Sequence, residues 1–545
     1  MSLRMSLAGL LAALCVMSPA LTAQTRPVVN APAGKLRGTA AGNVHVFKGI
    51  PYALPPTGQL RWKPPVPMPE WTNVRDAQQY GAACVQLKSS ATSIYAWDLG
   101  AISEDCLFLN VWAPANARRT PVLVWIHGGA LTGGSGGEPM YDGSRMAEQG
   151  ITVVSVNYRL GALGDLAHPE LSAESPRHIS GNYGLLDQIT ALRWVQRNIA
   201  SFGGDPGNVT IAGESAGGLS VMYLMVAPDA RPLFHRAITE SAYMISTPQL
   251  RDSPFGDFAS EAVGVWLAGK LNVSDLAGLR AMDAVALING AAAAGYSPLG
   301  TVDGVVMPRQ MVDAFDRGEQ AKVPILAGFN QGEIRSLRAL APPVPADASI
   351  YEKEIRQRYG DLADRFLALY PSSKLSESVL ATTRDALYGW TAERLVARQT
   401  AAGVRSFLYL FDHGYPAAES LGLHAFHASE LPYVFGTRDR TPIHWPVVPD
   451  TPVEARLSRA MLNYWVSFAR AGVPTAAGEA AWRSYGAERA YMAFTDTPVP
   501  MTQLMPGMYV LNEEVVCRRR TKGGIPWHWN VGIISPPMPP AASCR

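Results

Sequence analysis

The chain has 545 residues, of which 48% are hydrophobic and 17% charged, and its formal net charge is +2. This composition is typical of an ordinary globular protein and excludes a largely disordered chain. The near-neutral charge excludes a global field that would recruit nucleic acid or an anionic membrane, so neither is an expected partner.

The first residues predict an export signal. Arg4 supplies positive charge, an apolar stretch runs from Leu7 to Met17, and Leu21-Thr22-Ala23 is a plausible cleavage site. This stretch is too short to span a bilayer, and no later segment offers the ~20 uninterrupted apolar residues of a membrane helix. We therefore expect residues 1–23 to be a signal peptide and the mature chain, starting near Gln24, to be secreted or periplasmic.

Four cysteines remain after removal of the signal: Cys84, Cys106, Cys517 and Cys544. An even number in an exported chain favours two disulfides, for which three connectivities are possible. Pairing of sequence neighbours, Cys84 with Cys106 and Cys517 with Cys544, is our choice among them. No cysteine or histidine stands at zinc-ligand spacing around either pair, so no metal site is expected.

Residues 24 to about 120 are rich in proline and turns, with short strands such as Val44–Phe47, and apolar strand patterns alternate with helical ones from Pro121 onward. Short runs that are apolar on both faces are typical of buried parallel strands. The strands expected are 122–126, 151–156, 209–212, 237–239, 323–327 and 407–411, and the helices expected are 184–199, 216–226 and 458–471. This alternation predicts an α/β fold with a doubly wound, mostly parallel sheet. No repeat or linker divides the chain, so we expect residues 24–545 to form one domain.

Two segments match the G-x-S-x-G pattern of a nucleophile elbow, in which a strand turns sharply into a helix. In Gly213–Gly217, Ser215 follows a β-branched strand and opens a helical segment. In Gly133–Gly137, Ser135 lies in a glycine-rich stretch with no helix start. The context predicts Ser215 as the nucleophile and Ser135 as a chance match.

A second loop, His127-Gly128-Gly129-Ala130, directly follows the strand that ends at Ile126. A loop at that place can turn backbone N–H groups toward a developing negative charge, and its small residues let the backbone approach a substrate. A plain glycine turn is the alternative. The elbow motif further along the chain favours an oxyanion-binding loop.

These motifs resemble those of the type-B carboxylesterases, the family that includes the cholinesterases, and are most similar to those of its bacterial p-nitrobenzyl esterases. The resemblance covers most of the mature chain. The segments that carry it are Phe47–Ala53 with Pro55-Pro56 and Leu60–Trp62, Glu104–Trp112, Asn157–Arg159, Gly184–Gln188 and Phe202–Gly217.

The resemblance implies an α/β-hydrolase fold whose long insertions form an active-site gorge, with serine, acid and histidine in that order along the chain. The family motif after a strand assigns the acid to Glu333, with Asp303 as the alternative. The family's histidine stands three residues before a glutamate that opens a strand-like apolar run. The run Glu430–Gly436 therefore selects His427 as the base over His424.

Further roles follow from the same resemblance. The N–H groups of Gly129, Ala130 and Ala216 would hold the oxyanion, and Glu214 with Ser241 would form a buried pair beside the histidine.

Other positions are implied to be structural. Arg159 and Asp187 would support the fold. Cys106, in the segment Glu104–Trp112, would pair with Cys84 upstream. Tyr95 and Trp97 lie in the loop that this disulfide closes, where they line the gorge mouth or anchor the loop.

Together these features predict a secreted serine hydrolase that cleaves small-molecule carboxylic esters through an acyl-enzyme intermediate, without a metal or organic cofactor. Two alternatives stay open. Some members of the family have lost the triad and serve as extracellular binding partners. The triad alone also does not distinguish an esterase from an amidase or a lactonase.

Overall fold

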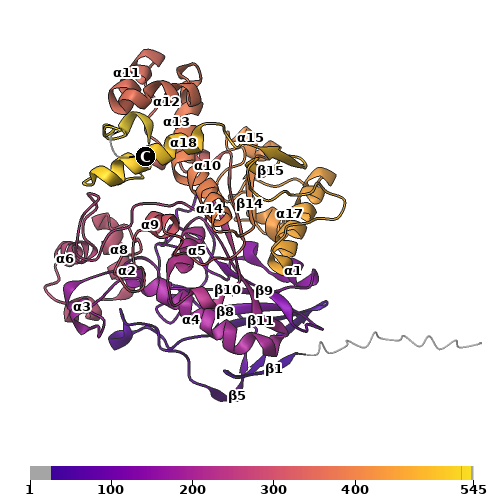
Figure 1. Cartoon of the computed structure of the whole chain (residues 1–545). Coiled ribbons are helices and arrows are strands. Elements are labelled where there is room, and N and C mark those ends of the chain that lie inside the picture. Colours follow the sequence, from indigo (N-terminus) through magenta and orange to yellow (C-terminus); the bar gives the residue numbers. More distant parts are fainter. Residues whose placement is uncertain (1–25, 529–530, 542–543, 545) are drawn as a thin grey trace, which may run out of the picture.

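The computed structural model describes residues 26–528, 531–541 and 544, so the expected signal peptide lies outside the described residues. Its main feature is a sheet of eleven strands that crosses the molecule (Figure 1). In spatial order the strands are β16 (Pro498–Thr502), β15 (Ala490–Phe494), β14 (Ser406–Phe411), β13 (Ile325–Asn330), β12 (Arg236–Glu240), β11 (Gly204–Glu214), β9 (Thr120–Ile126), β10 (Thr152–Val156), β8 (Phe108–Pro114), β4 (Val44–Pro51) and β3 (Thr39–Ala41).

The central seven strands, β15 to β10 in spatial order, are parallel, and antiparallel strands extend the sheet at both edges. This arrangement confirms the predicted fold class. Two smaller sheets lie beside it. They consist of β1 (Val28–Ala31), β2 (Gly34–Arg37) and β5 (Trp71–Asp76), and of β6 (Ala83–Cys84) with β7 (Ile102–Ser103).

Helices follow most of the parallel strands. They are α1 (Ser144–Glu148), α2 (Gly161–Asp165), α3 (Pro169–Glu174), α4 (Tyr183–Asn198), α5 (Ala216–Val226), α6 (Ser260–Lys270), α7 (Leu276–Ala281), α8 (Ala284–Ala294), α9 (Met311–Asp316), α10 (Glu333–Ser336), α11 (Ala348–Tyr359), α12 (Ala363–Leu369), α13 (Leu375–Arg384), α14 (Trp390–Ala401), α15 (Pro416–Ser420), α16 (Leu431–Phe435), α17 (Pro452–Ala471) and α18 (Met508–Lys522).

Both faces of the sheet are buried, because alternate residues of each strand enter different cores. In β9, Val122, Val124 and Ile126 join a core that also holds side chains of α4, α5 and α14. Leu123 and Trp125, on the opposite face, join a core with α1, α16 and α17. Strands apolar on both faces therefore form the parallel part of the sheet, as the sequence indicated.

A separate layer of helices, α11 to α13 with α18, lies at the top of Figure 1 around a small core of its own. The residues of this core include Tyr351, Tyr359, Phe366, Val379, Leu511 and Val515. The disulfide between Cys517 and Cys544 joins α18 to the last described residue.

The predicted strands and helices are present, but the strand-like run expected at residues 430–436 is wrong, because it forms helix α16. A short apolar run does not by itself distinguish a strand from a helix. Pro432 lies in the first turn of the helix, where its missing N–H costs nothing, and Gly436 ends it with a φ of 69°. Helix α17 begins six residues before the predicted position, because the Thr451 side chain caps it by accepting a hydrogen bond from the Glu454 N–H at 3.3 Å.

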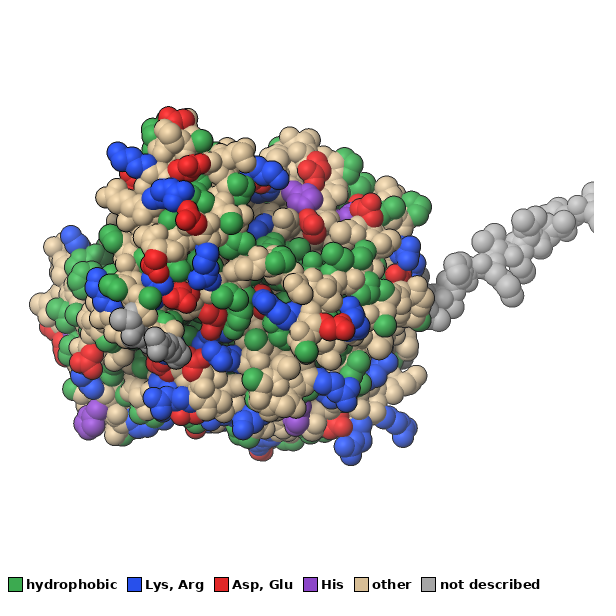
Figure 2. All heavy atoms as spheres, turned by 45° about the horizontal axis from the view of Figure 1, so that its top comes forward, with side chains coloured by type: hydrophobic (Ala, Val, Ile, Leu, Met, Phe, Trp, Pro, Cys, Tyr) green, Lys and Arg blue, Asp and Glu red, His purple; other side chains and the backbone are tan. Residues whose placement is uncertain are grey.

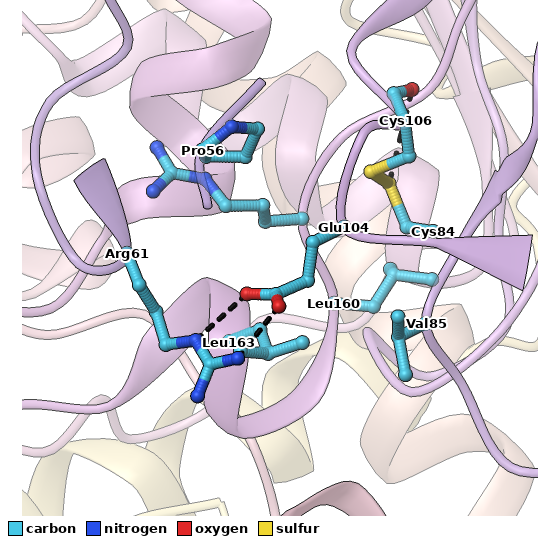
Figure 3. Close-up of a pocket in the computed structure, with 9 residues that line it drawn as sticks. Pro56, Arg61, Cys84, Val85, Glu104, Cys106, Leu160 and Leu163 are labelled. Carbon is cyan, nitrogen blue, oxygen red and sulfur yellow. Dashed lines mark hydrogen bonds and ion pairs between the residues drawn. A yellow bond between two sulfur atoms is a disulfide. The ribbon is translucent and has the colours of Figure 1, made fainter. Parts of the chain in front are cut away.

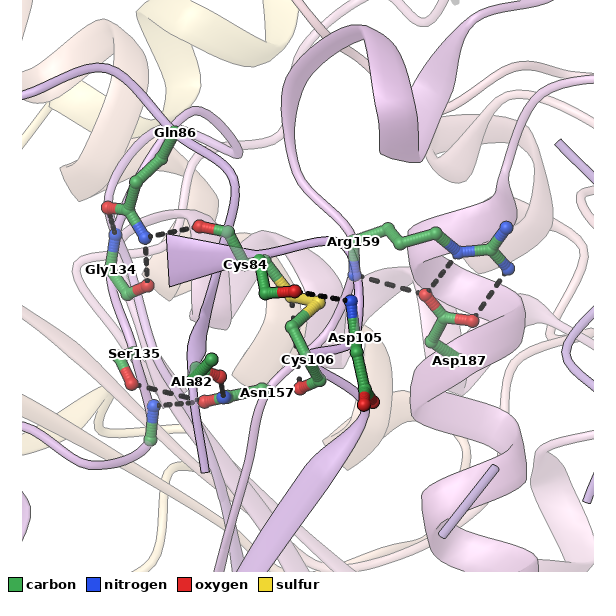
Figure 4. Close-up of a disulfide and its surroundings, with 12 residues drawn as sticks. Ala82, Cys84, Gln86, Asp105, Cys106, Gly134, Ser135, Asn157, Arg159 and Asp187 are labelled. Carbon is green, nitrogen blue, oxygen red and sulfur yellow. Dashed lines mark hydrogen bonds and ion pairs between the residues drawn. A yellow bond between two sulfur atoms is a disulfide. The ribbon is translucent and has the colours of Figure 1, made fainter. Parts of the chain in front are cut away.

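The disulfide between Cys84 and Cys106 supports the glycine-rich loop that follows β9 (Figure 4). Gln86 donates hydrogen bonds to the Cys84 carbonyl at 3.0 Å and to the Gly134 carbonyl at 2.9 Å. The Gly134 N–H donates back to Gln86 at 2.8 Å. The disulfide loop and the glycine-rich loop are thus held together. Both disulfides join the sequence neighbours that we chose.

Two ion pairs flank this disulfide, one partly buried and one fully buried. Arg61 and Glu104 meet with a distance of 2.6 Å between Nη2 and Oε2, beside a small cavity (Figure 3). Arg159 and Asp187 form a bidentate pair with distances of 2.7 and 2.8 Å, visible at the right of Figure 4. This second pair ties the chain after β10 to α4, the structural role expected of it.

Acidic and basic side chains are interspersed on the face shown in Figure 2. Within the part of the chain that the structure describes, no helix combines the length and apolar character needed to cross a membrane.

Candidate active site

Ser215 occupies the turn between β11 and α5. Its backbone angles, φ 56° and ψ −120°, are strained for a residue that is not glycine. The turn also needs close backbone packing, because a Cβ on Gly217 would lie 2.0 Å from the carbonyl oxygen of Ile126. The strand–turn–helix context that selected Ser215 over Ser135 is therefore present.

Glu333 and His427 form a buried acid–imidazole pair. The Nδ1 atom of His427 is hydrogen-bonded to Oε2 of Glu333, while Oε1 of Glu333 accepts from the Asn330 N–H at 2.8 Å. Glu333 is fully buried and His427 is 6% exposed. The bond holds the proton on Nδ1 and leaves Nε2 as the nitrogen that can accept another.

The Nε2 atom of His427 lies 3.1 Å from Oε1 of Glu214, the residue before Ser215. Among the described residues, no hydrogen bond joins this nitrogen to Oγ of Ser215. The structure therefore brings together the three predicted triad positions and Glu214, with the imidazole directed at Glu214. Proton transfer from the serine requires its Oγ and Nε2 to turn toward each other.

The loop after β9 presents the expected oxyanion donors. Gly129, Ala130 and Leu131 all have positive φ values, of 100°, 55° and 58°. The turn is closed by the Thr132 N–H, which donates to the Gly129 carbonyl at 2.9 Å. The N–H groups of Gly129, Ala130 and Ala216 have no acceptor within the described part of the chain. They are available to a developing oxyanion.

The first residue of this loop, His127, is held in place by Tyr158. The Tyr158 hydroxyl donates to the His127 carbonyl at 2.8 Å, and the two rings stack with their centroids 4.5 Å apart. Burial lowers the pKa of His127 to about 4, so this imidazole is neutral near pH 7.

Tyrosines surround the histidine. Tyr388 lies with its ring centroid 5.5 Å from that of His427 and 6.1 Å from that of Tyr243. It belongs to a π-helical turn, Asp385–Gly389, of the kind that often occurs at functional sites. The Tyr95 hydroxyl donates to the His427 carbonyl at 3.0 Å. Tyr95 thus anchors the disulfide loop on the site, one of the two roles left open for it.

The competing candidates lie elsewhere. The hydroxyl of Ser135 donates to Asn157 at 3.2 Å, and His424 pairs with Asp412 at 2.8 Å. Asp303, the alternative acid, accepts three backbone N–H groups of the turn at residues 305–307.

Ser241 lies at the end of β12 next to Glu240, and it is fully buried. Its N–H donates to the Gly328 carbonyl at 2.9 Å. No hydrogen bond joins the Ser241 side chain to Glu214 in the described part of the chain, although both are buried.

Sequence reasoning used Glu430 only as a landmark for the histidine, whereas the structure makes it part of the site. Asn330 Nδ2 donates to Oε2 of Glu430, so the strand that precedes Glu333 is joined to helix α16. Burial and the neighbouring glutamates raise the pKa of Glu430.

Glu138 was not identified from the sequence at all. It accepts from the Ser135 N–H at 3.0 Å, and the side chains of Trp97 and Tyr141 lie beside its carboxyl group. Burial raises the pKa of Glu138 to about 8. The one feature of the sequence that could have drawn attention to Glu138 is its position directly after the glycine-rich segment Gly133–Gly137.

Trp97 lies beside Glu138 and packs against the core, so it anchors the disulfide loop.

A serine on a strand–turn–helix elbow, a buried acid–imidazole pair and free N–H groups at the carboxyl ends of parallel strands define an α/β-hydrolase. Residues 25–509 match the model of the carboxylesterase family, and the chain belongs to that family. It is a carboxylesterase, an enzyme that hydrolyses carboxylic esters.

Individual relatives are similar over most of their length. Fumonisin B1 esterase of Sphingopyxis macrogoltabida is 35% identical over 503 residues, which cover 89% of each chain. Para-nitrobenzyl esterase of Bacillus subtilis is 36% identical over 469 residues, 83% of this chain and 91% of the relative. A solved PNB esterase structure matches with a TM-score of 0.78 at 32% identity, covering 89% of this chain and 99% of that one.

Proposed function

We propose that this chain is an exported carboxylic ester hydrolase that works through an acyl-enzyme on Ser215, with His427 as general base and Glu333 as the acid that orients it. The observation that carries the proposal is the buried bond between His427 Nδ1 and Glu333, formed next to the residue that precedes Ser215. Membership of the carboxylesterase family supports the ester chemistry.

The proposed reaction has two halves. His427 Nε2 takes the proton of the Ser215 hydroxyl, the alkoxide attacks the ester carbonyl, and the free N–H groups of the loop after β9 and of α5 stabilise the oxyanion. His427 then protonates the departing alcohol. In the second half it removes a proton from water, which releases the acid and restores the serine. Each oxyanion donor contributes roughly 3–4 kcal/mol to the barrier reduction.

The similarity to a para-nitrobenzyl esterase and the surroundings of His427 support ester substrates with an aromatic group. The relatives act on fumonisin B1 and on para-nitrobenzyl esters. In this chain, Tyr95, Tyr243 and Tyr388 supply aromatic surface near the histidine.

The proposal is tested with short- and medium-chain p-nitrophenyl esters and matching anilides. Wild type is expected to release p-nitrophenol, and folded Ser215→Ala to lose at least about 10³-fold in kcat, because the nucleophile is gone. Ser135→Ala, which removes the serine of the false motif, is the matched control and should retain turnover. Persistent turnover in Ser215→Ala would reject the assigned nucleophile, and faster cleavage of the anilides would favour an amidase.

Export is part of the same proposal, and its support is the pattern of residues 1–23. The amino terminus of the protein recovered outside the cytoplasm should begin near Gln24. An intact Met1 on the active protein would contradict export by a cleaved signal.

A further inference from the structure

A row of polar side chains crosses the carboxyl end of the sheet beneath the histidine. Glu214 of β11 pairs in register with Glu240 of β12, Glu240 with Gly328 of β13, and Gly328 with Tyr409 of β14. Residues in register on neighbouring parallel strands point to the same face of a sheet. A Cβ on Gly328 would lie 2.2 Å from the Tyr409 ring, so the ring lies across this glycine, toward Glu240.

Glu240, in the middle of the row, is buried with few hydrogen bonds to offset the loss of hydration. Glu240 is fully buried, and its Oε1 accepts one hydrogen bond, from the Trp465 indole at 3.0 Å. Its Oε2 and the Tyr409 hydroxyl have no hydrogen-bond partner in the described part of the chain. A buried carboxylate with a single neutral donor is costly, whereas the protonated acid is not.

The two glutamates are also cross-strand neighbours, so ionisation of one disfavours ionisation of the other. Neighbouring strands lie about 4.8 Å apart, and like charges at such a spacing away from water disfavour each other strongly. Burial raises the pKa of Glu240 to about 8, and burial with the charges of Glu333 and Glu240 raises that of Glu214 well above its usual range. Only Glu214 faces a group that can become cationic, since His427 Nε2 is 3.1 Å away.

Other ionisable groups surround this pair on every side. They are Glu333 at the start of α10, Glu430 before α16, Tyr409 of β14, His427, Glu138 of the glycine-rich loop and Tyr243 after β12. Apart from His427, none of these groups can carry a positive charge.

We propose that Glu214 and Glu240 together hold one proton, carried by Glu240, so that Glu214 remains the single negative charge facing His427 Nε2. Glu240 is then a positioning residue that acts on the general base through Glu214. This inference rests on the proposed function in taking His427 as the base. When the proton leaves Glu240 at high pH, a second negative charge appears beside Glu214 at this end of the sheet.

Infrared spectroscopy of the full chain counts the proton directly. The difference spectrum of wild type minus Glu240→Gln at pH 7 should contain the carbonyl stretching band of one protonated carboxylic acid, and this band should vanish at pH 10. Glu148→Gln, an exposed residue paired with Arg145, is the matched control and should show loss of an ionised carboxylate. A difference spectrum of Glu240→Gln that shows loss of an ionised carboxylate at pH 7 would overturn the proposal.

The pH profile of stability gives an independent readout. The folded state keeps the Glu240 proton to a higher pH than the unfolded chain, so wild type loses stability as the pH rises from about 4.5 to about 8. The Tm of Glu240→Gln relative to wild type should therefore be higher at pH 9 than at pH 5, by at least about 3 °C.

A Tm difference between wild type and Glu240→Gln that is independent of pH would contradict a proton held by Glu240 in the folded state. The infrared and stability measurements need no turnover. They therefore remain decisive if Ser215→Ala shows that the assigned nucleophile is wrong.

Discussion

His427 and His424 lie three residues apart and are both paired with carboxylates, yet their surroundings differ. His427 is buried against Glu333, whereas His424 pairs with Asp412 and Glu419 in a partly exposed position. Hydrogen bonding to Asp412 raises the pKa of His424, which favours the charged form of that imidazole.

Replacement of each histidine by glutamine separates the two roles. We expect His427→Gln to lower kcat by at least about 10⁴-fold, since the proposed general base is removed. His424→Gln should stay within about threefold of wild type and lose no more than about 1 kcal/mol of stability, as for an exposed ion pair. Initial rates on a p-nitrophenyl ester and thermal unfolding check both. Comparable losses in the two variants would mean that the base is misassigned.

Patterns along the chain were sufficient to nominate Ser215 and Glu333, because each stands at a fixed offset from a strand in its motif. They could not disclose Glu240 or Tyr409. These residues come into play only through the register of β11, β12, β13 and β14, which depends on how strands distant in sequence pair. A side chain whose role depends on a neighbour in another strand has no motif around it in the sequence.

At the scale of elements, the nucleophile elbow depends on space as much as on backbone freedom. The start of α5 packs so closely on β9 that a Cβ on Gly217 would meet the Ile126 carbonyl at 2.0 Å. In α6, Gly269 is exposed, and a Cβ there would meet nothing within 4 Å. The same substitution therefore has opposite consequences in the two helices.

Gly217→Ala is expected to destabilise the fold by at least about 2 kcal/mol and to abolish turnover, because backbone must move to make room. Gly269→Ala should stabilise by about 0.5–1 kcal/mol through helix propensity and keep full activity. Denaturant unfolding of both variants, with esterase assays, tests the pair. An active and fully stable Gly217→Ala would show that the elbow can relax.

Strand and helix types followed from local pattern wherever an element was long or buried on both faces. The exception, α16, is five residues long and wholly apolar, so its periodicity carried no information. Its helical state depends on the residues at its two ends and on packing against α17. The packing is a tertiary contact, which a local pattern does not reveal.

For the molecule as a whole, the two disulfides constrain different regions. The bond between Cys84 and Cys106 closes a loop whose Tyr95 hydroxyl reaches the His427 carbonyl. The bond between Cys517 and Cys544 fastens the end of the described chain to α18, in the helical layer remote from the elbow.

Removing either disulfide by paired Cys→Ser substitution should cost roughly 3 kcal/mol of stability. Only loss of the first, Cys84 with Cys106, should also reduce kcat/KM, by about tenfold or more, since the loop no longer holds its aromatic residue at the histidine. Assays well below the unfolding temperature distinguish the effects. Equal catalytic losses in the two double variants would show that the loop does not position the site.

The overall architecture was predictable because alternation of strands and helices leaves few arrangements. The layer formed by α11 to α13 with α18 was not predicted as a unit, since its members lie far apart in the sequence and share a core only after folding.

The bond between His427 and Glu333 spans 94 positions of the chain, and Ser215 stands more than a hundred residues before either partner. Such a centre has no local precursor, because contacts between distant segments form only after loop-closure entropy has been overcome. Recovery of turnover after dilution from denaturant should therefore come later than recovery of helical signal. In a preparation of this enzyme, an active-site titrant that reacts with the proposed nucleophile, Ser215, would measure the fraction of reactive molecules. That fraction would equal the fraction of molecules in which the whole sheet is assembled.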